Sequence, residues 1–173
     1  MQMLKFTGLL IISIMSFAAS SQDIAELERR NGFKDLKLGI HLDSIKGEKT
    51  FRKDLKEQNQ YPAKLYGFAD AAYTRIGEIP VSKIEFRTYI DLVYQITVVT
   101  DKDTRLMKAL ESIYGQADYD MKKETYFWKG QMLILKFHSY SRNQLELIYT
   151  SYSILNLMKA DKGKKVEDIA DDF

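Results

Sequence analysis

The sequence predicts an α+β protein with a single antiparallel sheet of about five to seven strands, a central helix at about residues 104–114 packed on one face, and a C-terminal helix. Residues 84–88 and 92–98 alternate apolar and polar side chains with the period of two that half-buried strands show. Residues 101–115 instead carry an apolar stripe at helical spacing. Runs of strands broken by few helices favour α+β over an alternating parallel fold.

We expect residues 1–21, MQMLKFTGLLIISIMSFAASS, to be a cleaved signal peptide. Lys5 gives the positively charged start, residues 6–17 form the apolar stretch, and small residues follow it. Cleavage after Ser20 or Ser21 fits these small residues. The alternative is a retained membrane anchor, but spanning a bilayer takes roughly 20 apolar residues, and this stretch is shorter.

The chain contains no cysteine and no Asn-x-Ser/Thr site for glycosylation. The lack of cysteine excludes disulfides, thiolate nucleophiles, cysteine metal ligands and the lipid-bearing cysteine of a bacterial lipoprotein. Together with the signal peptide, these features predict a periplasmic or secreted bacterial protein without stable membrane insertion after cleavage.

Beyond the signal peptide, residues 22–152 should form one α+β domain, with residues 153–173 as a C-terminal helix or tail docked on it. Removing Lys5 from the 26 basic residues leaves 25, against 24 acidic ones. The two signs are interspersed, without the basic stripe that marks nucleic-acid binding. We therefore expect no nucleic-acid partner.

The sequence predicts short helices and a strand in the N-terminal part of the domain. Residues 23–30 suit a helix that ends at Asn31-Gly32. A strand over residues 33–40 and a helical turn at 42–45 follow. Residues 51–62 are polar and ambiguous, and the sequence assigns them no structure.

The clearest strand signals predict a β-hairpin over residues 84–89 and 92–98. Ile90-Asp91 lies between the two strands as a tight turn. Because such turns usually contain glycine, the register of this hairpin stays open.

Residues 101–115, DKDTRLMKALESIYG, predict the clearest helix. Asp103 or Thr104 can cap its start, and Gly115 fits the position after its end. The following ADYD, residues 117–120, predicts a loop. The stripe that should lie on the sheet consists of Leu106, Ala109, Leu110 and Ile113.

The stretch TYFWKGQMLILKFH contains the only tryptophan, and it predicts strands at 125–128 and 132–138 joined by a tight turn at Lys129-Gly130. Trp128 either covers the edge of the core or lies exposed at a rim. A further strand is expected at 145–150. Alternation places Leu133, Leu135 and Phe137 on the face under the helix, and Met132, Ile134, Lys136 and His138 on the other.

The C-terminal segment has a helical seam with one lysine in it. Gly163 lies inside this segment and disfavours a helix by about 1 kcal/mol relative to alanine. A docked helix is nevertheless favoured, because a tail would expose the apolar members of the seam. The seam consists of Leu155, Met158, Lys162, Val166, Ile169 and Phe173.

No familiar catalytic or metal-binding pattern is present, so we predict no catalytic residues, no metal site and no cofactor, and ligand-binding residues stay unknown. The stretches KGEKT and KGKKV lack the glycine spacing of a P-loop. Asp101 and Asp103 begin like a calcium loop, but Leu106 stands where that loop needs glycine. His41 and His138 lack metal-ligand spacing and suit structural or surface roles better.

Tyrosine is abundant, with eleven residues beside nine phenylalanines. On strands such residues usually form a core and aromatic cross-strand pairs. The functional alternative is a stacking surface for sugar or peptidoglycan-like ligands, because aromatic rings offer flat apolar faces.

The stretches IGEIPVSKIEFRTYIDLVYQITVVT, LMKALESIYG, YFWKGQMLILKFH and LELIYTS, within residues 33–173, resemble small exported proteins of Bacteroidetes-type bacteria with uncharacterised function. In element order the chain is also similar to the β-lactamase-inhibitor-protein-like and outer-membrane assembly lipoprotein folds. Those are binding modules with helices on one side of a small antiparallel sheet. The chain lacks their lipidated cysteine or disulfides, so the resemblance implies a fold and no site residue.

Three functions follow as expectations. The first is a non-catalytic exported domain that binds an envelope protein or polymer, with pairing at an exposed sheet edge as one mode. The second is a small envelope hydrolase using carboxylates, which a buried carboxylate pair in a concave pocket would favour. The third is a small-molecule carrier, whose sign is an aromatic-lined cavity of a few hundred cubic ångströms between helix and sheet.

Overall fold

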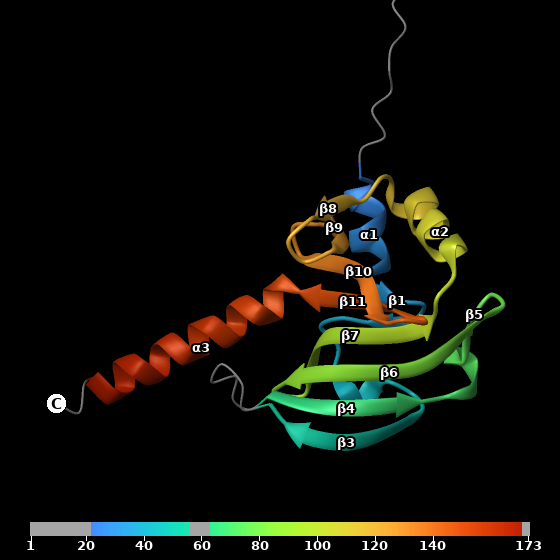
Figure 1. Ribbon diagram of the computed structural model, residues 1–173. Coiled ribbons are helices and arrows are strands. Elements are labelled where there is room, and N and C mark those ends of the chain that lie inside the picture. Colours follow the sequence, from blue (N-terminus) through green and yellow to red (C-terminus); the bar gives the residue numbers. More distant parts are fainter. Residues whose placement is uncertain (1–21, 56–62, 171–173) are drawn as a thin grey trace, which may run out of the picture.

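The computed structural model describes residues 22–55 and 63–170, the side chains of 163–170 excepted (Figure 1). The predicted signal peptide, the segment 56–62 and Phe173 lie outside the described residues. Within them, one antiparallel sheet has nine strands, more than the five to seven predicted. These strands are β3 (Glu48–Asp54), β4 (Ala63–Ala69), β5 (Arg75–Ile76), β6 (Ile79–Tyr89), β7 (Leu92–Asp101), β8 (Asp118–Asp120), β9 (Thr125–Lys129), β10 (Leu133–Ser141) and β11 (Gln144–Ser151).

The sheet consists of two meanders joined side by side: a first one of β3 to β7 and a second one of β8 to β11. Its strand order is β3-β4-β6-β7-β11-β10-β9-β8, with β5 paired to β6. The join is the pairing of β7 with β11, in which Ile96 lies opposite Tyr149. The strands missing from the prediction include β3, β5 and β8. They are short or carry exposed polar side chains, so they lack the alternation that marks a half-buried strand.

One face of the sheet is covered by α1 (Ile24–Arg30), a ribbon of β1 (Gly32–Phe33) and β2 (Leu36–Lys37), the short 3₁₀ helix η1 (Leu42–Ser44), and α2 (Thr104–Tyr114). The predicted helix at 23–30 and helical turn at 42–45 are confirmed. The predicted continuous strand over 33–40 is wrong. Lys34 adopts a left-handed backbone with φ 54° and turns the chain back on itself, so that Phe33 pairs with Leu36.

Helix α2 confirms the predicted central helix and corrects its buried stripe. Asp103 caps the helix by accepting the backbone N–H of Arg105 at 2.8 Å. Leu106 and Leu110 are buried on the sheet as expected, but Ala109 is exposed. The third buried position is Tyr114, because the contact line follows a spacing of four residues down the helix.

The hairpin between β6 and β7 has the predicted two-residue turn. Ile90 and Asp91 both adopt left-handed backbone angles, with φ 47° and 61°, and Tyr89 pairs with Leu92 across the turn. These are the signs of φ that a type I′ turn requires, and this turn matches the twist of the flanking strands. The register that the sequence left open is thereby fixed without glycine.

The hairpin between β9 and β10 differs from its prediction. Its last strand pair is Lys129 with Ile134, so the turn is wider than Lys129-Gly130. The physical reason lies in α1. The Glu28 carboxylate accepts the backbone N–H groups of Gln131 at 2.5 Å and Met132 at 3.0 Å, which holds the wider turn in place.

The C-terminal helix is present as α3 (Tyr152–Ala170), which follows β11 directly. Its first turns pack on the face of the sheet opposite α1, where Ile154 and Met158 contact Tyr89 and Tyr94. The Tyr89 hydroxyl also donates to the Asp161 carboxylate at 2.9 Å.

The predicted seam of α3 is correct only in part. Met158 is buried and Leu155 is partly buried, whereas Lys162 is exposed. The side chains of Val166 and Ile169 lie outside the described residues. Among the described residues, no helix is both long and apolar enough to cross a membrane.

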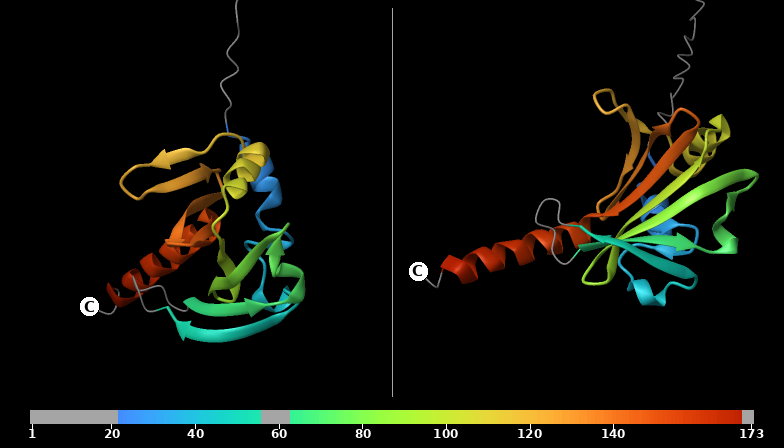
Figure 2. Two further views of the ribbon diagram at one scale, coloured as in Figure 1. Left: turned by 45° about the vertical axis from the view of Figure 1, so that its right-hand side comes forward. Right: turned by 60° about the horizontal axis from the view of Figure 1, so that its bottom comes forward.

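The sheet is strongly curved, with β8 to β10 as one arm and β3 to β4 as the other (Figure 2). Helix α1 lies on one side of the curve and α3 leaves from the other side. We call the side away from α1 and α2 the open face. It is defined by side chains of four adjacent strands: Lys83, Glu85, Thr97, Val99, His138, Tyr140 and Glu146.

Candidate ligand-binding groove

A groove of about 510 Å³ lies between the first turns of α2 and the β8–β9 hairpin. This volume is within the range of roughly 300–1,000 Å³ that small-molecule sites occupy. An aromatic-lined cavity between helix and sheet is the feature that we expected of a small-molecule carrier. The lining is formed by Thr104, Met107, Tyr119, Tyr126, Phe137 and Leu145, with Lys102, Asp103, Lys123 and Glu124 at the rim, and His138 and Ser139 of β10 complete it.

The floor of the groove is a row of aromatic side chains across three strands. Tyr119 pairs with Tyr126, and Tyr126 pairs with Phe137, so all three point to the face that α2 covers. The two tyrosine rings are 4.6 Å apart between centroids and tilted by 41°. Phe137 is buried, whereas Tyr119 and Tyr126 are 47% and 39% exposed.

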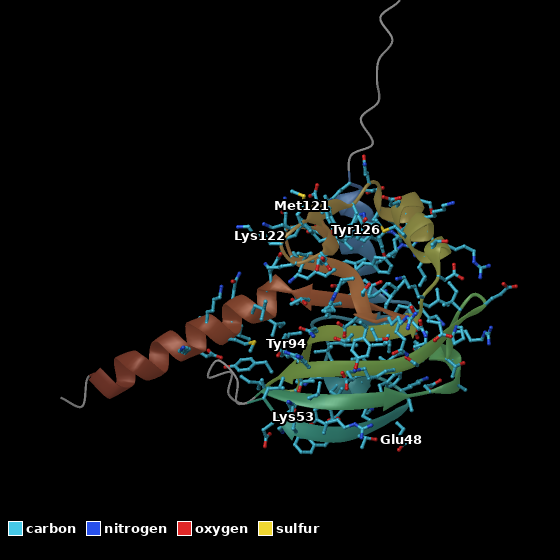
Figure 3. All side chains as sticks on the ribbon, viewed as in Figure 1. Glu48, Lys53, Tyr94, Met121, Lys122 and Tyr126 are labelled. Carbon is cyan, nitrogen blue, oxygen red and sulfur yellow. The ribbon has the colours of Figure 1, made fainter. Side chains whose placement is uncertain are left out.

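The row is exposed because the hairpin extends beyond the layer of helices. Figure 3 shows Tyr126 on the hairpin, with Met121 and Lys122 at its tip. At the tip, the Asp120 carboxylate accepts the backbone N–H groups of Lys122 and Lys123 at 3.0 and 3.2 Å. The hairpin therefore continues the apolar face of the sheet past the point where α2 covers it.

The rim of the groove carries both signs of charge. Asp103 binds the Arg105 guanidinium at 2.8 Å, and this hydrogen bond lowers the pKa of the Asp103 carboxyl below its usual value. The Lys123 ammonium lies 3.6 Å from Asp120. Two cations and two carboxylates line the hollow, so the lining has no net charge.

Trp128 is part of the core and does not line the groove. It is 0% exposed, its ring packs on Tyr114 at 6.0 Å between centroids, and its Nε1–H donates to the Gly115 carbonyl at 2.8 Å. The sequence left open whether Trp128 covers the edge of the core or lies exposed at a rim. In the structure it is buried in the core. The predicted alternation around it is confirmed: Leu133 is buried and Met132 exposed.

The open face carries a separate set of charged side chains. The Lys83 ammonium lies 3.2 Å from the Glu85 carboxylate and donates to the Tyr140 hydroxyl at 3.1 Å. His138 Nε2 lies 3.2 Å from the Glu146 carboxylate. Burial raises the pKa of Glu146, and the charge of Glu85 acts in the same direction.

These open-face carboxylates are each paired with a basic side chain. Val99 beneath them is only 1% exposed, because the charged side chains lie across it. The Lys83–Glu85 pair lies along strand β6, and the His138–Glu146 pair joins β10 to β11. The face thus contains two carboxylates, but both are bound to basic partners.

The remaining sequence candidates are dispersed. His41 is exposed at the start of η1, while His138 lies on the open face, so the two histidines do not share a site. The ADYD stretch forms strand β8 and is not the predicted loop. In the described part of the chain, no group of three or more histidine or acidic side chains is arranged to hold a metal ion.

Comparison with protein-family models, curated proteins and solved structures finds no match for this chain.

Sequence reasoning missed the pairing of Tyr119 with Tyr126. The only signal was the abundance of tyrosine around the tryptophan, because ADYD resembles a loop and β8 is too short to alternate. The exposure of the two rings also depends on where α2 lies on the sheet, which no local pattern encodes.

Proposed function

We propose that this protein is an exported, non-catalytic binding domain that holds a component of the cell envelope in the groove between α2 and the β8–β9 hairpin. The observation that carries this proposal is the half-exposed pair Tyr119 and Tyr126 on the groove floor. Aromatic rings left uncovered in a concave site supply a large apolar contact area at low entropic cost.

The sheet edges support binding less well than the groove does. Edge strand β3 has a bulge between Phe51 and Lys53 and carries Lys49, Arg52 and Asp54. Bulges and charged side chains are devices that keep other strands from adding to an edge. At the opposite edge, β8 has only three residues.

The carboxylates of the open face do not favour hydrolysis. General acid–base catalysis needs carboxyl groups that can reach a substrate. Glu85 and Glu146 are instead held by Lys83 and His138. The groove itself contains Asp103, which caps α2 and binds Arg105.

Cosedimentation with envelope fractions of the native cell tests the proposal. We expect the exported protein to sediment with the envelope and the double variant Tyr119→Ala/Tyr126→Ala to stay largely in solution. Tyr140→Ala is the matched control, because Tyr140 is 48% exposed on the open face. Equal sedimentation of the double variant and the wild type would exclude the groove as the binding site.

Export is tested separately by mass spectrometry of the protein recovered from the cell. The expected N-terminus is Ser21 or Gln22. A chain that keeps residues 1–20 would contradict the proposed export.

A further inference from the structure

We infer that the ligand of the groove is an uncharged glycan, a chain of sugar rings that stack on Tyr119 and Tyr126. This inference rests on the proposed function and names the chemistry of the ligand. It follows from three features of the groove: its aromatic floor, its charged rim and its unenclosed sides.

The floor offers ring faces without enclosing them. Tyr119 and Tyr126 lie side by side on neighbouring strands with 4.6 Å between centroids, and Met107 of α2 stands beside them. A pyranose ring has an apolar face of C–H groups and an edge of hydroxyl groups. Such a ring can cover a tyrosine face while its hydroxyl groups point to the rim.

The rim supplies polar partners without a net field. Lys102 and Lys123 oppose Asp103 and Glu124, so neither an anionic nor a cationic ligand gains from the sum of these charges. Ammonium groups only donate hydrogen bonds and carboxylates only accept them. A hydroxyl group does both, so a sugar can use Lys102, Lys123 and Glu124, while the Asp103 carboxylate is already bound by Arg105.

The sides of the groove are open, which suits a chain better than an enclosed small molecule. Seven of its lining residues are exposed to solvent: Lys102, Thr104, Tyr119, Lys123, Glu124, Tyr126 and Ser139. A sugar polymer could pass across the floor and continue beyond it on both sides. A small apolar molecule would instead keep much of its surface in water at this site.

The open face provides a contrast on the same molecule. Tyr140 is as exposed as Tyr119, but the Lys83 ammonium lies over its ring at 4.6 Å from the centroid. A cation already occupies the face of that ring. Tyr140 is therefore a tyrosine of equal exposure whose ring is not free to stack on a sugar.

The test uses purified soluble probes: chito-oligosaccharides and cello-oligosaccharides as uncharged chains, and polygalacturonate as an anionic chain. We expect an uncharged probe to bind, with an affinity that changes little between about 50 and 500 mM salt, because screening weakens only charge–charge attraction. Tyr126→Ala should weaken binding about tenfold or more, and Tyr126→Phe should stay within about twofold of the wild type, because phenylalanine keeps the ring.

Tyr140→Ala is the control and should bind like the wild type. Fluorescence of Trp128 shows whether each variant is folded, because this buried indole lies outside the groove. A variant with altered tryptophan emission is replaced by Tyr126→Leu, which removes the aromatic ring but keeps apolar bulk.

The outcomes separate this inference from the proposed function. One outcome is that the Tyr119 and Tyr126 variants lose envelope binding while the wild type binds neither uncharged probe. That result would reject the uncharged glycan as the ligand and keep the groove as the binding site. Salt-sensitive binding of polygalacturonate alone would also overturn the uncharged glycan. If the tyrosine variants bind the envelope like the wild type, both proposals fail.

Discussion

The indole N–H of Trp128 donates to the carbonyl oxygen of Gly115 at 2.8 Å, and this bond ties β9 to the end of α2. Gly115 ends the helix with φ 75°, a backbone angle that favours glycine. Trp128 thereby fixes the position of α2 relative to the β8–β9 hairpin, the two elements that form the groove. The tryptophan shapes the groove by holding α2 and the hairpin in place, and it does not line the groove itself.

Replacing this tryptophan should therefore destabilise the fold. We expect Trp128→Phe to lower the free energy of unfolding by roughly 1–3 kcal/mol, because it removes the hydrogen bond to Gly115 and part of the contact with Tyr114. Urea unfolding followed by circular dichroism measures this change. Tyr126→Phe on the same strand is the control and should change stability by less. A Trp128→Phe variant as stable as the wild type would show that the bond contributes nothing.

The turn at Ile90 and Asp91 should be open to improvement. A residue other than glycine in the left-handed region costs about 1–2 kcal/mol, and a β-branched one is especially strained. The double variant Ile90→Asn/Asp91→Gly should therefore raise stability by about 1 kcal/mol and the Tm by about 2–4 °C. Thermal unfolding measures the change. Ile90→Ala keeps a Cβ and is expected to recover less.

Two buried tyrosines should make the protein sensitive to alkali. Burial, strengthened by hydrogen bonds to Asp35 and Asp161, raises the pKa of Tyr73 and of Tyr89 to about 12 from the ordinary value of 10. The unfolded chain thus loses these protons first, so stability falls as pH rises from about 10 towards 12. Tyr73→Phe/Tyr89→Phe should flatten this fall in urea unfolding, and an unchanged slope would contradict the assignment.

The same Tyr89 hydroxyl fastens α3 through Asp161. Tyr89→Phe should therefore loosen the first turns of the helix by about 1 kcal/mol at neutral pH, the usual net contribution of one hydrogen bond. Hydrogen exchange of the amides in residues 154–161 measures this effect. Tyr73→Phe, which removes a hydroxyl bonded to Asp35 far from α3, should leave these amides unchanged.

Glu146 should lower stability at neutral pH. Its pKa is raised in the folded protein, mainly by burial, so folding disfavours its charged form. The cost is absent well below the ordinary pKa and appears as pH rises through and above it. Glu146→Gln should thus match the wild type near about pH 3 and be more stable at pH 7. Glu85→Gln, which removes the partner of Lys83 at 3.2 Å, should not share this gain.

The central parts of the fold could be predicted because local patterns and tertiary packing agree there. The alternation of Leu133, Leu135 and Phe137 with Ile134, Lys136 and His138 marks β10, and the first three side chains are buried. Asp103 and Gly115 mark the ends of α2 correctly. The two meanders join through β7 and β11, which are both rich in buried apolar residues. No local sequence pattern predicts that these two strands pair.

The candidate groove could not be predicted, for a physical reason. Tyr119 and Tyr126 form a pair only through the backbone bonds of an edge strand, and the groove above them forms only where the start of α2 comes close to the hairpin. Both facts are tertiary. Glu28 is a similar case, since a glutamate on a surface helix gives no sign that it binds the β9–β10 turn.

Strands β7 and β11 pair although α2 and most of the second meander lie between them in the chain. Closing such a long loop costs more conformational entropy than closing a hairpin, so we expect each meander to assemble first and their junction last. Until then, Ile96 and Leu147 lie on two uncovered strands rich in apolar residues, the state most open to aggregation. Pulse-labelled hydrogen exchange should show protection of the β10–β11 hairpin before the bonds of β7 with β11 form. Each newly made chain passes through this vulnerable interval before its two meanders meet.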